Sequence, residues 1–132
     1  MGLSSVSFWV PGGRAAATVA RHSARSAGAD FPAVEDDRVA LLVSELVTNA
    51  VQHGGADERT GVRVRVSSST ERLRVEVEDP GRNGDAPVER VTPEGGWGLL
   101  LVDGLADRWG LDRQPAGGSV AWFELSLEQR RN

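Results

Sequence analysis

The chain has 132 residues, a length that fits one domain with a single core and leaves no room for a second catalytic module of normal size. Its formal net charge is −4 and its arginines are scattered instead of forming a basic stripe, so we do not expect it to bind nucleic acid. It has no cysteine, which excludes disulfides and thiolate metal sites, and no basic leader or apolar run of membrane-spanning length, so we expect a cytoplasmic protein that does not enter membranes.

The amino-terminal part of the chain predicts one strand followed by two helices. Residues 5–10 alternate weakly between apolar and polar side chains and are followed by a Pro-Gly-Gly turn, which is typical of a short strand. Residues 14–27 carry apolar side chains at helical spacing, and Gly28 is placed to end that helix. The same spacing over residues 34–52 predicts a second helix.

The rest of the chain predicts a hairpin, a loop, a third helix and two closing strands. Residues 61–69 and 72–79 alternate cleanly between apolar and polar side chains, which indicates a β-hairpin. Residues 80–94 show no period and are rich in Gly, Pro and charge, so we interpret them as a mobile loop. The remaining elements are a helix and two strands, over 97–106, 108–112 and 118–127. The elements together predict an α/β fold with antiparallel strands.

The second predicted helix carries three polar side chains on one ridge. Glu45, Asn49 and His53 follow one another at intervals of four, and at about 100° per residue they form one gently drifting row between apolar neighbours. A carboxylate and an amide edged by apolar residues are partly desolvated and need partners, which a ligand or a metal ion would supply. On an ordinary amphipathic helix the same spacing would face solvent without any function, and the helix taken alone favours that explanation.

Two later segments favour a nucleotide site. Asp79 ends a predicted strand and is followed by Gly81, while Gly96 and Gly98 precede the third helix. Glycines let the backbone approach a phosphate closely, and the amino terminus of a helix offers unpaired N–H groups and a positive dipole end. The order of the three segments places them around one end of a sandwich of sheet and helices. The glycine cluster alone would be explained better as a flexible turn, and Asp79 alone is compatible with the cap of a turn.

Together the three motifs resemble the N, G1 and G2 boxes of the GHKL ATPase superfamily, which has the Bergerat fold. The motifs are Glu45-x-x-x-Asn49-x-x-x-His53, Asp79-x-Gly81 and Gly96-x-Gly98-Leu99-x-Leu101-Val102. The short chain and its closing segments resemble more closely the anti-sigma-factor serine kinases and their actinobacterial relatives. The resemblance covers nearly the whole chain, 1–132, and implies an α+β two-layer sandwich: a mostly antiparallel, mixed sheet covered on one face by about three helices.

The resemblance also implies a role for each motif. Asn49 would ligate a Mg²⁺ ion that bridges the phosphates of ATP, and Glu45 would be the general base of phosphoryl transfer. Asp79 would accept a hydrogen bond from the adenine amino group. The base and phosphates would also be bound by His53 of the first box, by Ser119, and by residues of the other two boxes, namely Gly81, Asn83, Gly96, Trp97, Gly98 and Leu99. His53 is also compatible with a purely structural role.

Two positions depart from the pattern of the family. Asn83 replaces a glycine that many relatives carry, and it still tolerates left-handed backbone geometry. Val120, with Ser119 beside it, is interpreted as the strand position where many relatives place a threonine near adenine. One hydrogen bond to the base is therefore expected to be missing, which would weaken nucleotide affinity.

The implied function is that of an ATP-binding anti-sigma regulator. It would phosphorylate a serine or threonine of a STAS-type antagonist protein, sequester a sigma factor, and form a homodimer through the first helix and the edge strands. The alternative is a nucleotide-dependent binding module without kinase activity, and the presence of Glu45 favours the kinase. A fragment of a sensor histidine kinase is disfavoured because the chain has no room for a helical phosphoacceptor domain. A purely structural interaction domain would be indicated by failure to bind nucleotide.

Overall fold

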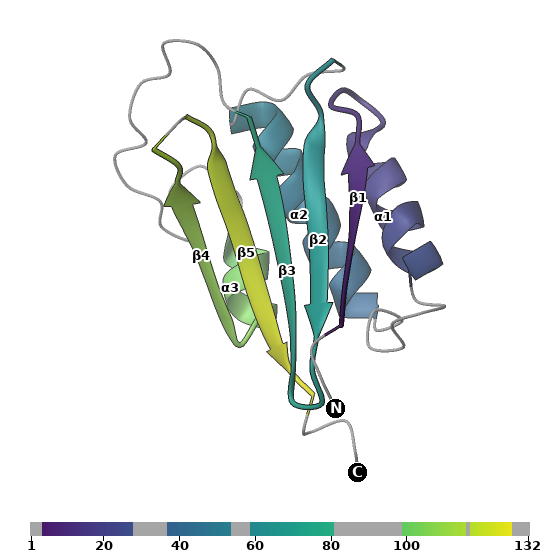
Figure 1. Cartoon of the computed structure of the whole chain (residues 1–132), viewed down its shortest axis with the longest axis vertical. Helices are drawn as coiled ribbons and strands as arrows, with labels where there is room; N and C mark the ends of the chain where they lie inside the picture. Colours follow the sequence, from purple (N-terminus) through teal and green to yellow (C-terminus); the bar gives the residue numbers. More distant parts are fainter. Residues whose placement is uncertain (1–3, 28–36, 54–58, 81–98, 116, 128–132) are drawn as a thin grey trace.

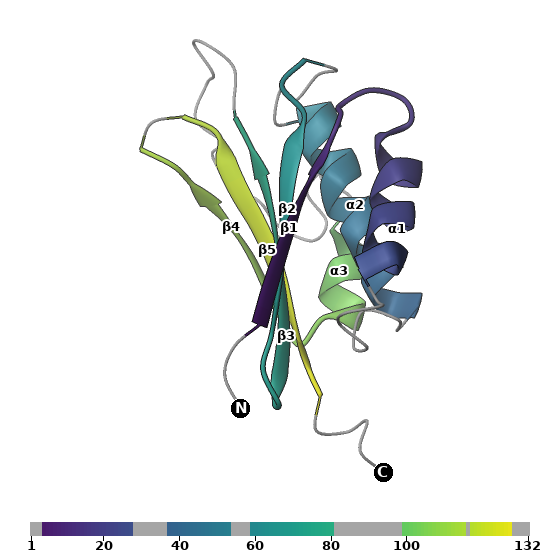
Figure 2. The same ribbon diagram turned by 45° about the vertical axis from the view of Figure 1, so that its right-hand side comes forward.

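The structure is a computed structural model that describes residues 4–27, 37–53, 59–80, 99–115 and 117–127. A five-stranded sheet forms one layer, and three helices form the other on one face of the sheet (Figure 1, Figure 2). The elements in chain order are β1 (Ser4–Val10), α1 (Ala16–Ala27), α2 (Asp37–His53), β2 (Val62–Ser68), β3 (Arg72–Asp79), α3 (Leu100–Leu105), β4 (Arg108–Arg113) and β5 (Ser119–Ser126). The predicted two-layer fold is confirmed, and every predicted helix and strand is present. The loop predicted over 80–94 lies, apart from Pro80, outside the described residues.

The sheet has the strand order β1-β2-β3-β5-β4. The predicted hairpin is confirmed, since β2 and β3 pair antiparallel with Val64 opposite Val77. The last strand of the chain, β5, lies between β3 and β4 and is antiparallel to both. All four pairings in the described sheet are antiparallel, so it lacks the parallel pair that a mixed sheet would have.

The core lies between the sheet and the helices. Because side chains alternate between the two faces of a strand, β2 and β3 direct their apolar residues to the helix-covered side. Val64, Val75 and Phe123 are fully buried there, and each buried side chain of this size stabilises the fold by roughly 1.5–3 kcal/mol. The helices contribute apolar residues at helical spacing, which in α2 are Val39, Leu42, Val43, Leu46, Val47 and Ala50. This packing holds α2 against β3. No helix in the described part of the chain is long and apolar enough to cross a membrane.

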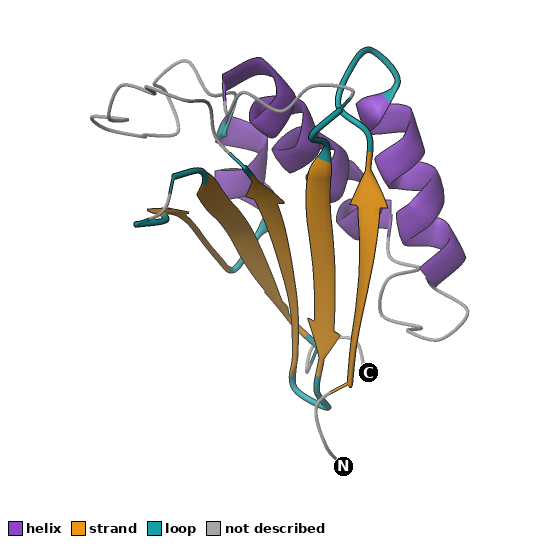
Figure 3. Ribbon diagram, turned by 45° about the horizontal axis from the view of Figure 1, so that its top comes forward, coloured by secondary structure: helices purple, strands orange, loops and turns teal. Residues whose placement is uncertain are grey.

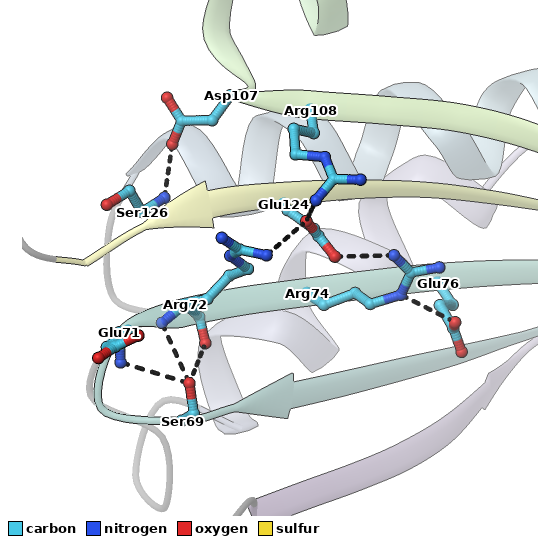
Figure 4. A network of polar contacts seen from close by, with 9 residues as sticks. All are labelled: Ser69, Glu71, Arg72, Arg74, Glu76, Asp107, Arg108, Glu124 and Ser126. Carbon is cyan, nitrogen blue, oxygen red and sulfur yellow. Dashed lines mark hydrogen bonds and ion pairs between the residues drawn. The ribbon is translucent and has the colours of Figure 1, made fainter.

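The open face of the sheet carries a cluster of charged side chains around Glu124 (Figure 4). The Glu124 side chain is buried, and its Oε2 accepts a hydrogen bond from Nη1 of Arg74 at 2.8 Å. Its Oε1 accepts one from Arg72 at 3.4 Å and forms an ion pair with Arg108 at 3.5 Å. Burial lowers the pKa of Arg74, but hydrogen bonds to Glu124 and Glu76 outweigh it, so that the pKa is raised above its ordinary value. Arg74 therefore stays charged.

Trp122 joins this cluster to β4. The guanidinium carbon of Arg74 lies 4.2 Å from the centroid of the Trp122 ring, which is a cation–π contact. Gly110 of β4 is directly opposite Trp122, and a Cβ atom built on Gly110 would lie 2.8 Å from the indole ring. The indole thus packs on the bare backbone of β4, and any side chain at position 110 would push the two apart.

We predict that Glu124→Ala lowers the free energy of unfolding by about 1.5–3 kcal/mol, the usual contribution of hydrogen bonds to charged groups. The substitution leaves Arg72, Arg74 and Arg108 facing one another, although the side chains of Arg72 and Arg108 are 53% and 62% exposed and can turn to water. Urea titration followed by circular dichroism would measure the loss. The control is Glu71→Ala in the exposed β2–β3 turn, where we expect a change within about 0.5 kcal/mol. Equal losses in the two variants would contradict the role given to Glu124.

Candidate functional site

A mostly apolar cavity opens between α2 and the sheet, near the end of β3. Figure 3 turns this end of the molecule toward the viewer. The cavity has a volume of about 20 Å³ and is partly open to solvent. Two polar side chains line it, Asn49 from α2 and Asp79 from β3. The apolar lining is contributed mainly by Leu46, Val77, Leu99, Trp109, Leu111 and Ala121. An apolar cleft with a few convergent polar groups is the usual form of a small-molecule site.

Asn49 is the polar group that α2 presents to the cavity. The packing of α2 on the sheet buries Asn49 to 6% exposure beside Leu46 and Ala50. Its amide nitrogen Nδ2 is buried and has no hydrogen-bond partner among the described residues. A buried donor without a partner costs about 1–3 kcal/mol, and a ligand in the cavity that accepts from it would offset this cost. The other buried side-chain nitrogen without a partner among the described residues is Nε1 of Trp122. The nearby hydroxyls of Ser44 and Thr48 are not available in the same way, because both donate to backbone carbonyls of the helix at 2.8 Å.

Asp79 stands at the carboxyl end of β3 and is 5% exposed. Its partner across the strand pair is Ser119, which is also buried and therefore shares its face of the sheet. Val120 is paired with Glu78 and borders a hollow on the opposite, open face. This corrects the expectation that Val120 takes the position near the base. Side chains alternate between the two faces of a strand, so a prediction that is wrong by one position places the side chain on the other face of the sheet.

Gly118 was not predicted as a site residue, but it fixes the backbone of Asp79. Its φ is +83°, and a Cβ atom built on it would lie 2.3 Å from the carbonyl oxygen of Asp79 and 2.9 Å from the carbonyl carbon of Pro80. The chain that enters β5 thus passes directly against the end of β3, where only glycine fits. The signal in the sequence was the glycine pair before the last strand.

The structure describes only some of the other predicted site residues. Leu99, just before α3, lines the cavity. Glu45 lies on α2 one turn before Asn49 and is partly exposed, but it does not line the cavity. His53 ends α2, and its side chain lies outside the described part. Five further predicted residues also lie outside it: Gly81, Asn83, Gly96, Trp97 and Gly98.

The lining suits a flat heteroaromatic base with an amino group. The apolar walls would exclude water from the base, and the Asp79 carboxylate would accept a hydrogen bond from the amino group. Within the described ranges no group of three or more His, Cys, Asp or Glu side chains could hold a metal ion. A divalent cation here would therefore depend on an amide oxygen and on ligand phosphates, a combination typical of Mg²⁺. The unpartnered amide of Asn49 is compatible with that arrangement.

Comparison with known proteins identifies the family of the domain. Residues 13–122 match the family described as the histidine kinase-like ATPase domain. The chain is 36% identical over 109 residues to the blue-light-activated histidine kinase 2 of Erythrobacter litoralis. It is 38% identical over 94 residues to the serine-protein kinase RsbW of Bacillus velezensis, and 30% identical over 95 residues to RsbW of Oceanobacillus iheyensis.

The chain matches only part of each of these proteins. The alignment with the histidine kinase covers 77% of this chain and 31% of the relative, and each alignment with RsbW covers 61% of this chain and 58% of the relative. The crystal structure of the RsbU and RsbW domains of Rv1364c from Mycobacterium tuberculosis superposes with a TM-score of 0.61 at 24% identity. That superposition covers 92% of this chain and 32% of the other, and it supports the fold.

The contact between Gly118 and Asp79 predicts that Gly118→Ala is more harmful than Gly117→Ala. Both glycines have positive φ, +83° and +102°, so both alanine variants pay a similar backbone strain. Only the side chain at 118 would collide with Asp79, and such overpacking costs typically about 1–3 kcal/mol more. Thermal unfolding of both variants would measure the difference. Similar melting temperatures would contradict the close approach.

The unpartnered amide predicts that Asn49→Ala separates stability from ligand binding. Removal of the amide relieves an unsatisfied buried donor at the edge of an open cavity, so we expect the free energy of unfolding without ligand to stay within about 1 kcal/mol or to rise. Nucleotide binding, measured by calorimetric titration with ATP and Mg²⁺, should be lost. A large loss of stability would show that Asn49 has a structural partner instead.

Proposed function

The chain belongs to the family of histidine kinase-like ATPase domains, and on that premise we propose that it is an ATP-dependent regulator of the anti-sigma type. In this proposal it binds ATP with Mg²⁺, transfers the γ-phosphate to a serine or threonine of a STAS-type antagonist protein, and sequesters a sigma factor. The observation that carries the proposal is the cavity in which the unpartnered amide of Asn49 and the carboxylate of Asp79 converge between apolar walls. The relatives named serine-protein kinase RsbW support the choice of a serine kinase.

The two polar groups of the cavity would have different tasks. Asp79, which is buried at the end of β3, would accept a hydrogen bond from the adenine amino group. Asn49 would hold the Mg²⁺ ion through its amide oxygen. When bound, the ion would neutralise the charge of the phosphates. The Asn49 Nδ2 donor would be left to hydrogen-bond a phosphate oxygen.

Glu45 is proposed as the general base. It lies one turn before Asn49 on α2 and is partly exposed, so a hydroxyl group of a docked protein could reach it. In the transfer step the hydroxyl oxygen would attack the γ-phosphorus, its proton would pass to the Glu45 carboxylate, and the bond from the γ-phosphorus to the oxygen of ADP would break. The expected homodimer, through the first helix and the edge strands, stays a prediction.

A second candidate is a nucleotide-dependent binding module without transferase activity. The position of Glu45 favours this candidate, because the side chain does not line the cavity that holds Asn49 and Asp79. In such a module nucleotide would change only the affinity for the protein partner. One relative is named a histidine kinase. A histidine is therefore an alternative phosphoryl acceptor to serine or threonine.

The kinase proposal predicts that Glu45→Gln lowers phosphoryl transfer by about 10²- to 10⁴-fold, the usual contribution of a general base, with ATP affinity changed less than threefold. Candidate antagonists would be incubated with γ-labelled ATP and Mg²⁺, and the products treated with acid. We expect acid-stable label, as for phosphoserine or phosphothreonine. Glu71→Gln, in the exposed turn at the far end of β3, is the matched control and should behave as wild type.

Three outcomes of this assay would contradict the proposal. Acid-labile label would assign the acceptor to histidine. Nucleotide-dependent binding of the antagonist without any transfer would favour the binding module. Equal transfer by wild type and Glu45→Gln would remove Glu45 from the reaction.

A further inference from the structure

One wall of the cavity is formed by a tryptophan that was not predicted as a site residue. Trp109 lies on β4 opposite the fully buried Phe123, so its side chain is on the helix-covered face of the sheet. It is partly buried, packs against the core and lines the cavity together with Leu111, the next residue on the same face. The cavity thus has an aromatic ring in a wall where aliphatic side chains form most of the remaining surface.

The polar edge of this ring is already occupied. The indole Nε1–H of Trp109 donates a hydrogen bond to Oδ1 of Asp103 on α3 at 2.8 Å. The indole N–H is therefore not available to a ligand, and the rest of the ring is carbon, which suits contact with a flat base better than a polar contact. Asp103 has a second link to the wall, since its backbone N–H donates to the carbonyl oxygen of Leu99 at 2.8 Å. Asp103 thus joins Trp109 and Leu99, two residues that line the cavity.

Trp109 is also held from the opposite side of the sheet. The next residue, Gly110, packs its backbone against the indole of Trp122 on the open face. Arg74 stacks on the same indole at 4.2 Å and is itself bound to Glu124 at 2.8 Å. The strand that carries Trp109 is therefore clamped between α3 on one face and the Glu124 cluster on the other. Such support on both sides is what a rigid binding wall requires.

From this arrangement we propose that Trp109 is a specificity-determining residue that contacts the base of the bound nucleotide, and that Asp103 is a positioning residue that orients its ring. The inference deepens the proposed nucleotide site and rests on it. It adds a recognition element that is separate from Asn49 and Asp79. The element would favour a purine base over the smaller pyrimidines, because a larger ring system covers more of the indole.

The test compares variants of Trp109 and Asp103 by calorimetric titration with Mg²⁺ and three probes: ATP, CTP and inorganic tripolyphosphate. Tripolyphosphate carries the phosphates without a base. Loss of base stacking should weaken ATP binding by Trp109→Leu about 10-fold or more and bring it close to the CTP value, while Trp109→Phe keeps most of the affinity. Tripolyphosphate binding should be unchanged in both. The exposed Trp9 provides the matched control, and Trp9→Leu should bind all three probes as wild type does.

Asp103 gives a test that does not depend on the stability of the core, because this side chain is exposed. Asp103→Ala should lower the preference for ATP over CTP about three- to tenfold, since a net hydrogen bond is worth about that factor. Asp103→Asn keeps an acceptor for the indole N–H and should restore the preference. A merely structural role of Asp103 would change all three affinities together and leave the ratio of ATP to CTP unchanged.

The outcomes separate this inference from the function on which it rests. If wild type binds ATP and Trp109→Leu binds it equally well while folded, the role of Trp109 is overturned and the nucleotide site stands. If Trp109→Leu weakens tripolyphosphate as much as ATP, the residue does not act through the base, and the inference is again overturned. Failure of the wild type to bind any nucleotide would overturn both proposals.

Discussion

The packing of α2 on the apolar face of β3 is the constraint on which the site depends. One face of the sheet is formed by valine, leucine and phenylalanine side chains, whose burial away from water is favourable. In the described structure the helices cover that face only. To bury its own apolar stripe, α2 must lie along the sheet with its carboxyl-terminal half near the end of β3. Asn49 and Asp79 meet at the cavity because they occupy corresponding ends of these two packed elements. The core and the candidate site are therefore products of the same contact.

At the cavity the protein gives up stability. Asn49 buries an amide nitrogen that has no partner in the described structure, and an alanine at this position would carry no such penalty. Gly118 is held at positive φ so that the chain can pass against Asp79. Features of this kind are tolerated in binding sites because the ligand supplies the missing partner.

The two faces of the sheet contribute to the site in different ways. The covered face supplies the residues that line the cavity, and the open face supports β4 through Trp122, Arg74 and Glu124. A cluster on the face opposite the cavity can thus hold a cavity wall, because both faces of β4 are in contact with other side chains. This explains why a glycine is needed at position 110.

The sequence by itself determined the helices and strands, since hydrophobic periodicity and turn residues act over a few positions. The order of three motifs predicted Asn49 and Asp79 as site residues, and in the structure both line one cavity. Only the tertiary structure decided the contributions of Trp109 and Gly118 and the face on which Ser119 and Val120 lie. These placements depend on strand order and register, and a shift of one residue in the register moves a side chain to the other face of the sheet. The pairing of Arg74 with Glu124 joins positions 50 apart in the chain, and no local pattern encodes contacts of that length.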